Sequence, residues 1–306
     1  MASLKNIKLK IHSYKKTGTV TRAMEAVSAV KMRKSQERAF SGRAYAAAAL
    51  TILEKLAGTS TKPHSLLQEK AVGKSCFIII TSDKGLAGSL NSGVIRRVER
   101  ELHDLHLTTS NVVLIAIGRR GADYFSSRGF EVKIKHENVS DSVTEQDIRE
   151  IADSVLAWHA AGEINRVFVG YQNFLSTFEQ EPTVRQIVPI TREVIAQMVA
   201  GIRPARGKYA PSSGKTNANP AAYTIEPEPE EVLAELLPKL LNIAIFHALL
   251  EAKASEHSAR MVAMKNATDK SKEMVKLSTR IYNKVRQAAI TREVSEITSG
   301  IEAMAA

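Results

Sequence analysis

The last part of the chain constrains the fold most, because it has the composition of one very long helix. After Pro238 the sequence contains no further proline, and Gly300 is the only glycine there. If the 68 residues after Pro238 form one helix, that helix extends about 100 Å at 1.5 Å per residue. A compact domain of this size does not need such a helix, so the segment predicts a rod.

A seven-residue repeat runs along this segment and predicts a coiled-coil seam. Five of its 14 positions are polar, whereas a dedicated dimerisation zipper would use Leu and Ile. A weak seam of small residues favours two helices of one chain that twist together, with much of their surface facing another protein. The repeat consists of Ile243, His247, Leu250, Ala254, His257, Met261, Met264, Thr268, Ser271, Val275, Ser278, Tyr282, Val285 and Ala289.

The first segment, residues 1–58, predicts the other helix of this pair. It contains no proline and consists mainly of good helix formers. Gly18, next to β-branched residues, predicts a weak point or kink. Apolar residues follow helical spacing at Ala23, Val27, Val30 and Met32.

The centre of the chain changes its period and predicts a parallel α/β sheet with right-handed crossovers. Apolar runs at 76–81, 112–118, 132–135 and 166–171 predict strands, and 184–190 predicts a further one. Helical stretches near 92–105, 119–128 and 144–161 separate them. Residues 203–227 are rich in Pro, Gly, Ser and Asn and predict a mobile loop or linker. The expected domains are therefore 1–58, 74–200, 203–227 and 230–306.

The charge of the chain predicts an acidic partner. The formal net charge is +11, and residues 1–43 carry eleven Lys or Arg against Glu25 and Glu37. Nucleic acid, anionic lipid and an acidic protein loop all fit this charge. No uninterrupted apolar run approaches the roughly 18 residues that cross a bilayer, so no direct membrane span is expected. The single Cys76 opens an apolar run, which indicates a buried thiol in a reducing, cytoplasmic setting.

Several stretches imitate functional motifs without completing them. The triplets at Gly73 and Gly214 lack the earlier glycine of a phosphate-binding loop and do not follow a strand. The stretch 82–91 (SDKGLAGSLN) follows a strand but lacks the three-glycine dinucleotide spacing, so it predicts a structural turn. His103 and His106 form an incomplete metal site. We therefore expect no catalytic residue, no cofactor and no metal.

Three stretches together resemble one family, the gamma subunits of F-type ATP synthases. Residues 21–34 (TRAMEAVSAVKMRK) are similar to the family's N-terminal helix, and 82–91 to its "SDRGLCGGLN" turn. Residues 255–269 (SEHSARMVAMKNATD) and 283–297 (NKVRQAAITREVSEI) resemble its most diagnostic segment. Lys84, Ala87 and Ser89 depart from the turn, and the loop near 205–221 has no cysteine pair. Thiol chemistry is therefore not expected at either place.

The resemblance implies an antiparallel two-helix coiled coil from the two ends of the chain, beside a Rossmann-like α/β domain. It implies a non-catalytic rotor that couples proton flow to ATP synthesis or hydrolysis and regulates the ATPase. The implied partners are the alpha and beta subunits, the epsilon subunit and the membrane c-ring, at the cytoplasmic face of a bacterial plasma membrane. The implied coupling residues are Met24, Lys31, Arg33, Lys34, Arg260, Gln287, Thr291 and Glu293.

Two rival hypotheses follow from the residues alone. A basic coiled coil could bind nucleic acid, but this predicts aromatic residues interleaved with the basic ones, and the N-terminal stretch has only Tyr14, Phe40 and Tyr45. A small-molecule α/β enzyme would use the stretch 82–91, and nucleotide binding by the isolated chain would identify it.

Overall fold

The computed structural model describes residues 4–56, 65–68, 70, 72–191, 194 and 228–305. The chain divides into two compact units. One unit consists of Met1–Ala29 with Arg260–Ala306, and the other consists of Val30–Ala259. The predicted loop 203–227 lies outside the described residues, and the domain boundaries drawn from the sequence remain predictions.

Two long helices, α1 (Leu4–Leu56) and α6 (Pro229–Ala305), are the first and the last elements along the sequence. Between them, in the part of the chain that the structure describes, lie the short 3₁₀ helix η1 (Ser65–Leu67), five strands and three helices. The strands are β1 (Lys74–Ile80), β2 (Val112–Ile117), β3 (Glu131–His136), β4 (Ile164–Phe174) and β5 (Gln180–Val188), and the helices are α2 (Leu90–Asp104), α3 (Arg119–Ser127) and α4 (Gln146–Ala160).

The predicted sheet is confirmed, with strand order β3-β2-β1-β4-β5. The pairs β1–β2, β1–β4 and β2–β3 are parallel. Strand β5 is antiparallel to β4, with Phe174 opposite Gln180 at the turn end. A tight turn permits only an antiparallel neighbour, so this strand needs no crossover helix. The expected strands and helices of the centre all occur.

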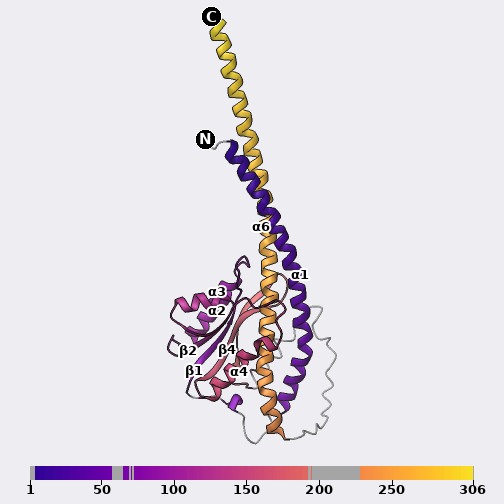
Figure 1. Cartoon of the computed structure of the whole chain (residues 1–306), viewed down its shortest axis with the longest axis vertical. Coiled ribbons are helices and arrows are strands. Elements are labelled where there is room, and N and C mark those ends of the chain that lie inside the picture. The colour runs from indigo at the N-terminus through magenta and orange to yellow at the C-terminus, as the bar shows by residue number, and fades with distance from the viewer. Residues whose placement is uncertain are drawn as a thin grey trace. The chain divides into compact units, whose positions relative to one another are not determined.

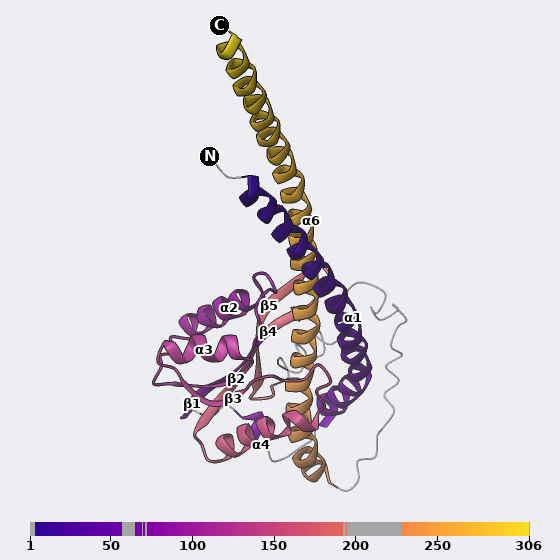
Figure 2. The same cartoon turned by 45° about the horizontal axis from the view of Figure 1, so that its top comes forward.

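The sheet has a separate apolar core on each face, and Figure 2 shows the helices that cover them. Helices α2 and α3 cover one face, where Phe77 stacks on Phe168 with ring centroids 4.7 Å apart. The other face is covered by α4 and by the first part of α6, whose Leu237, Leu241 and Ile245 are buried against it. The first turns of α6 are thus part of the α/β core, which the coiled-coil interpretation of this helix did not predict.

The first unit, Met1–Ala29 with Arg260–Ala306, is a pair of antiparallel helices, as predicted (Figure 1). The hydroxyl oxygens of Thr21 and Thr268 lie 2.7 Å apart, and a Cβ added at Gly18 would lie 3.4 Å from that of Ser271. Residue numbers therefore decrease along α1 as they increase along α6, which is the antiparallel arrangement. Glycine at a close helix contact lets the backbones approach, so Gly18 is a packing position. Helix α1 continues through it without a break.

The heptad predicted for the second half of α6 is confirmed by burial. Thr268 and Ser271 are buried, and Val275, Ser278, Tyr282, Val285 and Ala289 are half-buried among mostly exposed neighbours. On α1 the helix predicted from the spacing of Ala23, Val27, Val30 and Met32 is confirmed, but these apolar residues do not mark its buried face. Val27 and Val30 are 55% and 59% exposed, and Ala23 is also exposed. The buried positions of α1 are Ile7, Thr21, Ser28 and Ser35. Small residues permit close packing of the two helices. The buried face of α1 is therefore the face with small side chains and not the face with the most apolar ones.

One stretch within Glu231–Met304 of α6 is long and apolar enough, by composition, to cross a membrane. Its mean hydropathy is 1.6, but half of it is buried inside the protein. The core helix of a soluble protein has the same properties, and here the buried part covers the sheet.

Candidate partner-binding surface

A cationic groove lies along the helix pair of the first unit. It has a volume of about 630 Å³, and its floor includes Gly18, Thr268 and Ser271. Because these side chains are small, the two helices leave a furrow between them there, which Tyr14 and Val275 also line. Four basic side chains line its sides: Lys15, Arg22, Lys272 and Lys276.

Most of these cations face solvent without a counterion. Lys272 pairs with Asp269 at 3.0 Å, through side chains that are both well exposed. Within the described residues, Lys15, Arg22 and Lys276 make no ion pair. Like charges in a narrow groove raise the local positive potential, so the groove favours an acidic segment of another molecule.

The C-terminal end of α6 is a single helix with an exposed apolar stripe. Extending the register of the Thr21 and Gly18 contacts brings Leu4 level with Val285, so no described residue of α1 lies beside the last turns of α6 (Figure 1). Steps of four and three residues place the stripe on one face. Its members are 52–90% exposed: Ile290, Val294, Ile297, Ile301 and Met304. A continuous apolar face of this kind is typical of a contact with another protein.

The sequence-predicted coupling residues fall into three groups. Met24 and Arg260 are half-buried in the helix pair, and Arg260 makes at least one further interaction. Gln287, Thr291 and Glu293 are exposed on the single-helix end of α6. The third group is the basic trio Lys31, Arg33 and Lys34 on α1, which belongs to the α/β unit. Five of the eight residues thus lie in the helix-pair unit and three in the α/β unit.

The three residues of the basic trio differ in their surroundings. The side chain of Arg33 is 82% exposed and lies 3.4 Å from Glu37 of the same helix. Lys34 is exposed and has no ion pair among the described residues. Lys31 instead reaches across to the α/β domain, where its ammonium lies 2.7 Å from the carboxylate of Asp141. Sequence reasoning assigned Lys31 to a partner and missed this intramolecular contact.

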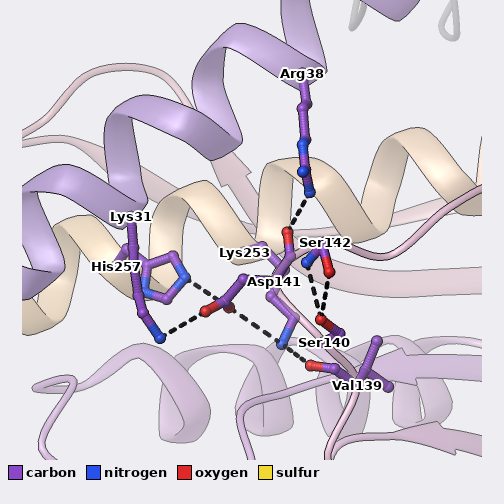
Figure 3. Close-up of polar contacts among 8 residues, drawn as sticks. All are labelled: Lys31, Arg38, Val139, Ser140, Asp141, Ser142, Lys253 and His257. Atoms are coloured by element: carbon purple, nitrogen blue, oxygen red, sulfur yellow. Dashed lines mark hydrogen bonds and ion pairs between the residues drawn. The ribbon is translucent and has the colours of Figure 1, made fainter.

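Asp141 is a junction between three parts of the chain (Figure 3). It lies in the loop between β3 and α4, and its carboxylate contacts Lys31 of α1 and His257 Nε2 of α6, the latter at 2.9 Å. Burial alone would raise the pKa of Asp141, but the hydrogen bonds and charges of Lys31, His257 and Lys253 lower the pKa below its ordinary value of 3.8. Asp141 is therefore ionised at neutral pH.

The stretch 82–91 is a turn that is closed by its own hydrogen bonds and also accepts hydrogen bonds from the start of α3. Ser82 donates from its backbone N to Asn91 Oδ1 at 2.9 Å and from its hydroxyl to the carbonyl of Lys84 at 2.6 Å. The cavity beside it, lined by Thr81, Ser82 and Gly118 among others, has a volume of only about 10 Å³. This volume holds about one water molecule. The geometry favours the structural-turn interpretation over the cofactor site.

The remaining candidates from the sequence are the histidine pair and the single cysteine. His103 is exposed and lies 3.6 Å from Asp104. No group of three or more His, Cys, Asp or Glu side chains that could hold a metal occurs in the described part of the chain. Cys76 is buried, and this burial raises the pKa of its thiol to about 12 despite the opposing charge of Lys133. Such a thiol is unreactive.

Comparisons with known proteins agree with this architecture. The family model "ATP synthase" matches residues 3–304. The ATP synthase gamma chain of Brevibacillus brevis is 37% identical over 303 residues, which covers 99% of both chains. That of Exiguobacterium sibiricum is 37% identical over 304 residues, also with 99% coverage of both.

Solved structures share the fold. The central stalk and c-ring structure of the Tetrahymena thermophila mitochondrial ATP synthase contains a chain that is 25% identical, with a TM-score of 0.57, covering 81% of this chain and 99% of its own. A chain in a Euglena gracilis mitochondrial ATP synthase structure has a TM-score of 0.63 at 17% identity, covering 98% of this chain and 94% of its own.

Two long terminal helices and a doubly wound α/β domain are the architecture that this chain shares with a chain of the central stalk and c-ring structure of a known ATP synthase. The family model and the full-length relatives identify the family. The chain belongs to the ATP synthase family, as one of its gamma chains.

Proposed function

We propose that this chain is the central-stalk rotor of an F-type ATP synthase, and that it performs no chemistry by itself. The observation that carries the proposal is the match to gamma chains along the whole length of the sequence. In this proposal the helix pair turns inside a ring of alpha and beta subunits. The chain also binds the epsilon subunit and the membrane c-ring, on the cytoplasmic face of the membrane.

The proposed mechanism depends on an asymmetric shaft. A ligand or partner shifts a conformational equilibrium only through a difference in its contacts with the two states. A shaft that touched three catalytic sites equally would therefore shift none of them. The helix pair differs around its circumference: the cationic groove lies on one side, while Val27, which does not line the groove, is exposed elsewhere on α1. Rotation would then present a different face to each site in turn.

The cationic groove and the C-terminal end of α6 would contact different parts of such a ring. We assign the cationic groove to acidic loops of the beta subunits, because Lys15, Arg22 and Lys276 have no ion pair among the described residues. The apolar stripe from Ile290 to Met304 suits an apolar lining around the end of the shaft. Met24, Arg260, Gln287, Thr291 and Glu293 are further proposed contacts.

Assembly tests the proposal directly. The chain should co-purify with alpha, beta and epsilon subunits as a stable complex when the four are expressed together. The ATPase rate of the alpha–beta ring should differ strongly between preparations with this chain and preparations without it. Recovery of the chain alone, as a monomer that carries RNA, would contradict the proposal.

Charge variants of the groove test its part in this function. Exposed ion pairs contribute roughly 0–1 kcal/mol each, so Lys15→Gln alone should change the ATPase rate only modestly. A variant with Lys15, Arg22 and Lys276 all changed to Gln should lower it several-fold, and more at low salt than at high salt. Lys270→Gln is the matched control, since Lys270 pairs with Glu273 at 2.8 Å and does not line the groove. An equal effect of the control would remove the groove from the mechanism.

A further inference from the structure

The two long helices are attached to the α/β domain in different ways. Helix α6 is held by an apolar core, in which Leu233, Leu237, Leu241 and Leu249 are at most 1% exposed. Among the side chains of α1 that the structure describes, Lys31 and Arg38 contact the domain through polar groups. Lys31 pairs with the Asp141 carboxylate at 2.7 Å, and Arg38 Nη1 donates to the Asp141 backbone carbonyl at 2.6 Å. Both of these contacts of α1 end on one residue.

Asp141 is also fixed from the side of α6. His257, whose side chain is 4% exposed, lies 2.9 Å from the carboxylate through its Nε2. Lys253, 12% exposed, donates to the carbonyl of Val139 at 2.8 Å and lies 4.0 Å from the carboxylate. Figure 3 shows these side chains converging on the loop from the two helices.

This arrangement is stronger than an ordinary surface ion pair. An exposed pair is screened and competes with side-chain freedom. Here two of the partners are largely buried, and one carboxylate connects groups that are 116 and 110 positions away in sequence. Hydrogen bonds in such a network reinforce each other. Loss of the carboxylate would remove an interaction of the buried His257 Nε2 and the negative charge near Lys253, and would release Lys31 at the same time.

We propose that Asp141 is a positioning residue that joins α1 to α6 and the α/β domain, so that torque acting on the domain reaches both helices of the shaft. This inference rests on the proposed rotor function. It assigns Lys31 a role inside the chain, through Asp141, and not in direct contact with a beta subunit.

Amide hydrogen exchange of the isolated chain measures the junction itself. In Asp141→Asn, exchange in residues 30–38 of α1 should become roughly three- to tenfold faster, the range expected when one or two charge-assisted hydrogen bonds are lost. Glu137→Gln removes an acidic charge from the same loop and is exposed, so it is the matched control and should leave this exchange unchanged. Unchanged exchange in Asp141→Asn would overturn the proposal.

Coupling in the assembled ATP synthase measures the consequence. The ratio of ATP-driven proton pumping to ATP hydrolysis should fall about two- to fivefold in Asp141→Asn and in Lys31→Ala, as weak polar contacts allow. The double variant should fall no further than either single one, because the two residues act through one contact. Additive losses would mean that Lys31 acts on a partner, and would overturn the proposal.

A covalent bond should replace the ion pair. In a variant with Lys31→Cys and Asp141→Cys, a short bismaleimide should restore the pumping ratio, while the untreated variant stays low. The native Cys76 does not interfere, since it is buried and the pKa of its thiol is about 12. Failure of the cross-link to restore pumping, or faster exchange without any loss of coupling, would contradict the proposal. If the unmodified complex neither assembles nor pumps, the proposed function fails instead.

Discussion

The hydroxyl pair at the centre of the helix seam leads to a prediction that can be worked out in numbers. Thr21 and Thr268 lie 2.7 Å apart, oxygen to oxygen. Each also has a backbone acceptor on its own helix: the carbonyl of Gly18 for Thr21 at 3.2 Å, and that of Met264 for Thr268 at 2.8 Å. The two hydroxyl protons therefore have three possible acceptors, namely the two backbone carbonyls and the oxygen of the other hydroxyl. Valine has the shape of threonine, so a Thr→Val change removes only the hydroxyl.

Each single substitution should cost about 0.5–1.5 kcal/mol, because the remaining hydroxyl loses its cross-helix partner but keeps its backbone bond. The double substitution should cost less than the sum, and should come within about 0.5 kcal/mol of the original chain, because two methyl groups meet where two hydroxyls met. The coupling free energy is thus expected to be about 1 kcal/mol or more.

Native-state hydrogen exchange of the peptides around residues 14–28 and 264–275 is the suitable assay, because a chain of two units need not unfold in one step. Thr279→Val is the matched control. Thr279 donates to the carbonyl of Val275 at 2.7 Å, in the same way as Thr268 does, but it is exposed and has no partner on α1 among the described residues. A double variant as unstable as the sum of the two single ones would refute the reasoning.

Three further predictions concern the α/β unit. Gly118→Ala should lower the free energy of unfolding in urea by about 3 kcal/mol, because Gly118 has a φ of +99° and the added Cβ would lie 2.0 Å from the Thr81 carbonyl oxygen. Gly129→Ala is the control: Gly129 has a φ of +81° but nothing within 4 Å of the added Cβ, so this change should cost only about 1 kcal/mol. Because the pKa of Asp141 is lowered on folding, its contribution to stability is complete above the ordinary 3.8 and is lost as the pH falls through the lower folded value. The urea midpoint should therefore fall less between pH 5 and pH 3 in Asp141→Asn than in the original chain, and an equal fall would be evidence against the junction. Cys76 should react with iodoacetamide at neutral pH only after unfolding, because burial raises the pKa of the thiol to about 12; mass spectrometry of the native chain would detect any earlier reaction.

Most of the fold could be predicted because its signals are local. The apolar runs of the centre are continuous, which is typical of parallel strands buried on both faces, and all five strands and three helices occur where the pattern places them. The heptad of α6 was predictable for the same reason. Its positions are the less exposed ones as far as Ala289, even where they are Thr or Ser.

The matching face of α1 could not be predicted in this way. Val27 and Val30 are the more apolar residues, yet they face solvent, while Ser28 and Ser35 are buried. The choice depends on how closely two particular helices approach, and only the pairing of Gly18 with Ser271 and Thr21 with Thr268 shows that distance.

The sequence by itself determined the helix–α/β–helix order, the family and the absence of a complete catalytic motif, because each depends on residue type at a fixed spacing along the chain. The tertiary structure decided which residues meet over long separations. Asp141 gave no signal in the sequence, since nothing local distinguishes it from other loop carboxylates; its role follows from Lys31 and His257, which the fold brings to it from opposite ends of the chain. Local spacing specifies the elements, whereas electrostatic and steric fit between distant elements exists only once they have packed.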